Sequence, residues 1–220
     1  MLINSNLWVP GGNTIRTMTT SKTCLAQAVL TEEFSRGFGI YDLGQLIGIL
    51  SIHNDPEIEL HDKFMTITTV DGWSKTRFYY ADRSTIVEPP QKDISISRED
   101  NVCFRLGAED VKKLTRSAIA LQNPCICIRS RPGEEYIEMA TVNNSMDTAN
   151  EHSIRVHNDA SYSDLDFEYV LKMMNIMLIS TSYDVMLSPK KVVQFDGVVG
   201  DATRVSYWIP TEKESRLVET

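Results

Sequence analysis

This chain of 220 residues has few cysteines, no long apolar run and no excess of positive charge. No apolar run approaches the roughly 20 residues that a helix needs to span a bilayer. The N-terminal Met-Leu-Ile-Asn-Ser-Asn lacks the basic and apolar regions of a signal peptide. We therefore predict a protein without a membrane partner. The apolar fraction of 42% is ordinary for a globular chain that buries a core in one large or two smaller domains.

Cysteine is limited to four residues, and two of them, Cys125 and Cys127, alternate with isoleucines in a strand-like run. Such a pair without a second pair or nearby histidines is a poor zinc site. We predict buried free thiols in a reducing cytoplasm, with no metal and no cofactor.

Catalytic motifs are also missing. The chain has neither the glycine-rich phosphate loop nor the Gly-x-Ser-x-Gly turn of serine hydrolases, and its four histidines form no His-x-x-x-His pair. Paired carboxylates are present, as in Asp164 with Asp166, but paired acids need a geometry that spacing does not show. We predict that the protein has no catalytic residue and is not an enzyme.

The net charge of −8, from 22 basic and 30 acidic residues, argues at first against DNA as a partner. Function can depend on the distribution of charge more than on its sum. The spacing of apolar residues predicts a strand over 102–106 and a helix from Ala108 to about Leu121, with Val111, Leu114, Ala118 and Leu121 on its packed side. On the opposite side it places a purely basic face, formed by Lys112, Lys113 and Arg116. By itself this pattern fits a phosphate-facing surface and an ordinary solvated face equally well.

Residues 39–60 read as a strand end, a short helix and a new strand. Asp42 can cap the helix, and Leu43, Leu46, Ile47 and Leu50 form one apolar stripe. The default interpretation of this segment is structural. Its residues are nevertheless distinctive: Tyr41-Asp42-Leu43, Gly48-Ile49-Leu50-Ser51 and Asn54-Asp55 resemble the matching segment of the sliding clamps of T-even-type bacteriophages, the DNA polymerase processivity factors.

The resemblance continues along most of the chain, more weakly toward residue 209. It includes these segments: Ile3-Asn4-Ser5, Ala81-Asp82, Ser84-Thr85, Val87 with Pro89, and Ala108-Glu109-Asp110. It implies a DNA clamp fold of the α+β class, with two similar domains that carry antiparallel sheets outside and helices inside. Three subunits would then close head to tail into a trimeric ring.

The organisation of the sequence agrees with two domains. We expect an N-terminal domain over 1–87, a proline-containing connector over 88–100 and a C-terminal domain over 101–220. In the N-terminal half the strands are expected near 14–19, 23–30, 57–60, 65–70 and 74–80. In the C-terminal half they are expected near 102–106, 125–129, 153–156, 183–187, 192–195 and 203–209. A third helix is predicted from Asp164 or Asp166 to Ile176, with Lys172 on its outer face.

The resemblance implies a ring that encircles double-stranded DNA and tethers the phage DNA polymerase. Its contacts with DNA would be weak, nonspecific and salt-dependent, since tight contacts would stop sliding. The residues that we expect to face DNA are Lys112, Lys113, Arg116 and Lys172.

The resemblance also implies a pocket for short apolar peptides of the polymerase and of the clamp-loader ATPase complex. The candidates lie on the connector and on C-terminal strands: Ile94, Ile96, Val192, Val193, Tyr207, Trp208, Ile209 and Pro210. For Trp208 a role in sheet packing is an equal alternative. Further implications are coactivation of late viral transcription through late-transcription factors, and a location in the cytoplasm of the infected bacterial host.

Related clamps have an amphipathic helix before the Ile3-Asn4-Ser5 segment, and this sequence does not contain it. We expect a version extended upstream to be more stable or more soluble. Two other functions stay open at this point. A metal-dependent nucleic-acid enzyme would cleave DNA with magnesium, and a phage structural protein would neither stimulate a polymerase nor form a ring of three.

Overall fold

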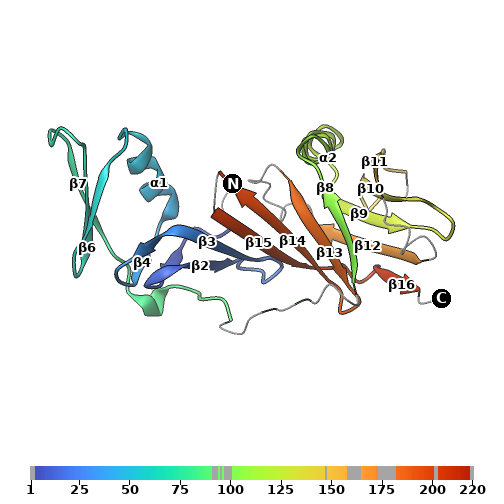
Figure 1. Cartoon of the computed structure of the whole chain (residues 1–220), viewed down its shortest axis with the longest axis horizontal. Coiled ribbons are helices and arrows are strands. Elements are labelled where there is room, and N and C mark those ends of the chain that lie inside the picture. The colour runs from blue at the N-terminus through green and yellow to red at the C-terminus, as the bar shows by residue number, and fades with distance from the viewer. Residues whose placement is uncertain are drawn as a thin grey trace. The chain divides into compact units, whose positions relative to one another are not determined.

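The computed structural model describes residues 3–90, 94, 96, 101–146, 148–157, 165–172, 182–200 and 203–218. The chain divides into two compact units, Met1–Gln91 and Lys92–Thr220 (Figure 1). Each unit combines antiparallel strands with an α-helix, so the structure has the predicted α+β composition. Within the described ranges, no helix is both long and apolar enough to cross a membrane.

The first unit contains three groups of antiparallel strands. Strands β1 (Leu7–Val9) and β4 (Phe38–Ile40) pair with each other, as do β2 (Gly12–Met18) and β3 (Leu25–Phe34). Strands β5 (Glu57–Leu60), β6 (Phe64–Thr68) and β7 (Lys75–Tyr79) form a three-stranded sheet in that order. A single 3-10 turn, η1 (Arg83–Thr85), follows them.

Helix α1 (Leu43–Ser51) begins as the sequence predicts, because the Asp42 side chain accepts a hydrogen bond of 3.0 Å from the Gln45 amide. Leu46 is buried in the core of this unit, and Ile49 packs against that core. The predicted stripe is wrong at Ile47, whose side chain is 47% exposed. The buried face is centred near Leu46, and a residue one position later lies about 100° further round the helix.

Helix α2 (Ala108–Leu121) and its sheet dominate the second unit. Strands β11 (His152–His157), β10 (Tyr136–Val142), β9 (Cys125–Ser130), β12 (Asp166–Lys172) and β16 (Arg216–Val218) are neighbours in this order. Strands β15 (Thr203–Pro210), β14 (Val192–Val199), β13 (Tyr183–Ser188) and β8 (Val102–Leu106) form a second antiparallel row. Helix α2 lies against β10 and β11 (Figure 1).

We call the sheet β11–β10–β9–β12–β16 the first row and the strands β15–β14–β13–β8 the second row. Side chains alternate along each strand of the first row, so one face of this sheet is apolar and the other is charged. On β9 and β10 the apolar face is formed by Ile128, Ile137 and Met139, all fully buried, and β12 adds Phe167 and Leu171. This face is the core of the unit. The other face carries the charged residues described below.

The predicted helix from residue 164 or 166 to 176 is wrong over the residues that the structure describes. Residues 166–172 form β12, which pairs with β9 on one side and with β16 on the other. Strand register places Phe167, Tyr169 and Leu171 on one face of the sheet and Glu168 and Val170 on the other, which is a period of two rather than 3.6. Aromatic and β-branched residues fit such a strand, and pairing on both sides overrides a local helical pattern. Residues 173–176 lie outside the described part of the chain.

Candidate nucleic-acid interface

Helix α2 is fixed to the second unit by an apolar stripe and by its C-terminal end. Val111, Leu114 and Ala118 are buried, as the sequence predicts, whereas Leu121 is only partly buried. The helix ends at Gln122, which adopts the left-handed conformation with φ 56°. Beyond it, the side-chain Nδ2 of Asn123 donates to the backbone oxygen of Thr141 at 2.8 Å and to that of Asn150 at 2.9 Å. These bonds tie the end of α2 to β10 and to the loop before β11.

The apolar face of the first row is the one that α2 covers. The helix packs against β10 and β11. On the charged face, Cys125, Cys127 and Val170 form a small apolar cluster of their own, and no residue of α2 belongs to it. The outer side of α2 and the charged face of the sheet therefore point in opposite directions.

Three cations lie on the outer side of α2, and all three are exposed: Lys112, Lys113 and Arg116. The expectation of a purely basic face is wrong, because Lys112 Nζ lies 3.0 Å from Glu109 Oε1. Lys113 Nζ lies 3.7 Å from Asp110 Oδ1. The hydrogen bond from Lys112 and the charge of that lysine lower the pKa of Glu109. Three cations and two carboxylates leave the face with one net positive charge.

Lys172 lies apart from this group. It follows Glu168 and Val170 on the charged face of β12, and its Nζ lies 3.5 Å from Glu212 Oε1. Since α2 covers the opposite face, the structure does not bring Lys172 together with the cations of the helix. The prediction failed because it placed Lys172 on a helix rather than on a strand.

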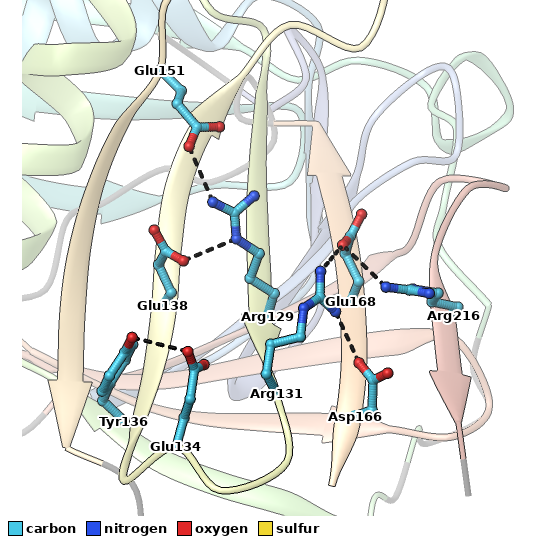
Figure 2. Close-up of polar contacts among 9 residues, drawn as sticks. All are labelled: Arg129, Arg131, Glu134, Tyr136, Glu138, Glu151, Asp166, Glu168 and Arg216. Atoms are coloured by element: carbon cyan, nitrogen blue, oxygen red, sulfur yellow. Dashed lines mark hydrogen bonds and ion pairs between the residues drawn. The ribbon is translucent and has the colours of Figure 1, made fainter.

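The charged face of the sheet carries a ladder of ion pairs across β9, β10 and β12 (Figure 2). Arg129 lies directly opposite Glu138 in the β9–β10 register, and the Arg129 Nε donates to Glu138 Oε2 at 3.0 Å. Another nitrogen of the same guanidinium donates to Glu151 at 3.0 Å. These bonds raise the pKa of Arg129 and lower that of Glu138, so both groups stay charged.

A second arginine continues the ladder toward β16, as Figure 2 shows. Arg131 donates to Asp166 at 2.8 Å and to Glu168 at 3.2 Å. Arg216 approaches the same Glu168 at 4.0 Å. The arginines of this ladder are thus held by carboxylates from neighbouring strands, and a phosphate would have to displace those carboxylates to bind them.

The residues proposed for a peptide pocket divide between two faces of the second row. Strand register places Val193 opposite Ile209 and Gln194 opposite Trp208. The first pair points into the core, where Val193 and Ile209 are fully buried. Tyr207 lies on the same side, 3% exposed and in edge contact with the ring of Tyr183.

The other face of β14 and β15 carries the remaining candidates of these strands. Val192 is partly buried, Pro210 is exposed, and Trp208 is 8% exposed with its Nε1 donating to Gln194 Oε1 at 2.9 Å. On the connector, Ile94 is 41% exposed and Ile96 is partly buried. Of all the candidates, Val192, Pro210 and the two connector isoleucines present side-chain surface to a partner, whereas Trp208 is buried.

The structure describes all four cysteines and shows no disulfide bond between them, and Cys24, Cys125 and Cys127 are buried. Burial raises the pKa of the Cys127 thiol to about 12. In the part of the chain that the structure describes, no group of three His, Cys, Asp or Glu side chains is close enough to hold a metal ion.

Two features of the site were missed at the level of sequence, although both had a signal. The spacing of Glu109 to Lys112 and of Asp110 to Lys113 is three residues, which brings side chains together on a helix. For the ladder, the only signal in the sequence was the alternation of charged residues at 129, 131, 166 and 168. These residues can be recognised as partners only when strand order and register are known.

Comparison with known proteins gives one consistent result. A family profile described as "gp45 sliding clamp, C terminal" matches residues 103–212. The sliding clamp of Escherichia phage RB69 is 30% identical over 219 residues, which cover 97% of this chain and 91% of that protein. The sliding clamp of Vibrio phage KVP40 is 24% identical over 211 residues, covering 96% of this chain and 92% of that protein.

The fold is that of a DNA clamp. The chain superposes on the PCNA of A. fulgidus, solved with the C-terminal region of FEN-1 bound, with a TM-score of 0.71. The superposition covers 97% of this chain and 92% of that chain at 13% sequence identity, so it bears on the fold alone. The sequence profile, the identity to the phage proteins and the fold agree, and the chain belongs to the gp45 family of bacteriophage sliding clamps.

Proposed function

We propose that this DNA sliding clamp, a polymerase processivity factor, works as a closed head-to-tail ring of three copies in which α2 faces the encircled duplex. The observation that carries this orientation is the contrast between the two sides of the second unit. The outer side of α2 exposes Lys112, Lys113 and Arg116 with a positive balance. On the opposite side the ladder holds Arg129 and Arg131 in ion pairs.

The outer side of α2 attracts a polyanion such as DNA. On the opposite side, the arginines of the ladder are already paired with carboxylates and are not available to phosphates. Contacts from two lysines and one arginine to phosphate oxygens carry no sequence information, so the duplex can move past them. The ring holds the polymerase on its template by topology, because a closed ring cannot leave the duplex sideways.

In this scheme the protein is a scaffold and not an enzyme, and its work is done by binding. Its partners are double-stranded DNA, the phage DNA polymerase, the clamp-loader ATPase complex and late-transcription factors, in the cytoplasm of the infected bacterial host. The PCNA of A. fulgidus was solved with a peptide region of another protein bound. For this chain the outer face around Val192, Trp208 and Pro210 is the proposed place for such peptides.

The first test is the native mass by light scattering over a dilution series. We expect a species of about 75 kDa, three times the chain mass of 24.9 kDa. A mass of one chain at every concentration would contradict the ring, because a single copy cannot encircle DNA.

The second test is binding to a short linear duplex with free ends, which a ring can enter by threading. The variant K112Q/K113Q/R116Q removes three charges but keeps long side chains that favour a helix. We expect weaker binding and a flatter salt dependence, with the log–log slope falling by about 0.9 for each phosphate that the variant no longer neutralises. The matched control is K190Q/R204Q/K213Q, which removes three exposed charges outside α2. Equally weakened binding in the two variants would refute the assignment of α2 as the DNA-facing element.

A further inference from the structure

The cations on α2 are not equivalent, because two of them already have a carboxylate partner. Glu109 and Asp110 occupy the first turn of the helix, three positions before Lys112 and Lys113. The Lys112–Glu109 distance is 3.0 Å and the Lys113–Asp110 distance is 3.7 Å. Arg116, by contrast, has no ion pair with any residue in the ranges that the structure describes.

Glu109 faces the same solvent as the lysines, and the Asp110 side chain is 34% exposed. The Glu109 side chain is 75% exposed and that of its partner Lys112 is 59% exposed, so neither belongs to the core. A phosphate that approaches Lys112 would come within a few ångströms of Glu109. This is shorter than the screening length of about 8 Å at physiological salt, so the repulsion between the two anions is felt.

We propose that Glu109 and Asp110 act as internal counter-ions of the DNA-facing helix. They compete with phosphates for Lys112 and Lys113, weaken those contacts, and leave Arg116 as the principal phosphate contact of α2. This inference rests on the proposed function and specifies how the same surface holds DNA loosely enough to slide.

Acidic residues in a first turn also stabilise a helix by interacting with its dipole. That role alone would make the carboxylates matter for stability and not for DNA. The two roles are distinguishable, since removing the carboxylates should lower stability slightly in both cases but should tighten DNA binding only if they compete with phosphates.

The test compares E109Q/D110N with E33Q/E135Q, a control that removes two exposed carboxylates outside α2. Binding of the full-length protein to a fluorescein-labelled linear duplex is followed by anisotropy between about 25 and 200 mM salt. We expect E109Q/D110N to bind about threefold to tenfold more tightly at low salt than the control, with a steeper salt dependence. Affinities of the two variants that agree within error would overturn the proposal.

Single cation variants make the test specific. In the wild-type background, R116Q should weaken binding more than K112Q does. In the E109Q/D110N background the two effects should become similar, because Lys112 is then free to bind phosphate. A ranking that is unchanged when the carboxylates are removed would also overturn the proposal. If K112Q/K113Q/R116Q binds DNA like the wild type, the proposed orientation of α2 itself fails, and this outcome is distinct from a failure of the counter-ion role.

Discussion

The side chain of Trp208 offers a quantitative test of how the second unit is held together. It is 8% exposed, and its Nε1 donates to Gln194 Oε1 at 2.9 Å across the β14–β15 pair. In W208F the ring shrinks and the donor disappears, while the acceptor stays in a site that is 9% exposed. An unsatisfied buried acceptor costs about 1–3 kcal/mol and the smaller ring volume about 1 kcal/mol more, so we expect the unfolding free energy to fall by about 2–4 kcal/mol.

The assay is urea unfolding followed by circular dichroism at one fixed protein concentration, because the stability of an oligomer depends on concentration. The expected destabilisation moves the midpoint down by about 1 M for a slope near 2–3 kcal/mol per molar. A double-mutant cycle with Q194M isolates the pair, and the coupling energy should be about 1 kcal/mol. A W208F protein within about 0.5 kcal/mol of the wild type would refute the packing role, since that is the range of ordinary surface substitutions.

Three further predictions concern packing, backbone space and thiol ionisation. L114A, at a site 1% exposed, should lower the unfolding free energy by about 2–5 kcal/mol, whereas I119A, at a site 73% exposed, should change it little. G39A would place its Cβ 2.6 Å from a backbone oxygen and should cost about 1–3 kcal/mol, while G48A, in an open helical site, should gain about 0.5–1 kcal/mol in the same denaturant assay. Burial raises the pKa of the Cys127 thiol from 9.0 to about 12. The contribution of this thiol to the unfolding free energy is therefore complete below pH 9, and it is lost as the pH rises toward 12 because the unfolded chain ionises first. Unfolding free energies measured across that range should fall more steeply for the wild type than for C127S, and equal slopes would contradict this assignment.

Much of the local structure could be predicted from particular residues. Asp42 marks the start of α1, and the apolar spacing over 108–121 predicts the bounds of α2 correctly. The alternation of Cys125 and Cys127 with isoleucines predicts β9, and the structure confirms two buried thiols on one face. These predictions succeed because capping, helical periodicity and strand alternation depend on residues close together in the sequence.

The prediction of a third helix failed because distant segments decide the structure of residues 166–172. Residues 166–172 have enough apolar residues at helical spacing to suggest a helix, but pairing with β9 and β16 makes them a strand. This change moved Lys172 to the charged face of the sheet, beside Glu212. It also brought Asp166 and Glu168 to Arg131, which no local pattern connects.

By itself, the sequence determined the resemblance to the family, helices α1 and α2 and the cations of α2, because these depend on residue identity and short-range periodicity. Tertiary structure alone decided which carboxylates pair with Lys172 and with the arginines of the sheet. It placed Lys172 on the opposite side of the sheet from α2, and it divided the pocket candidates between core and surface. The physical reason is that strand register sets the face and the partner of every side chain in a sheet, and register is fixed by contacts between residues far apart in the chain.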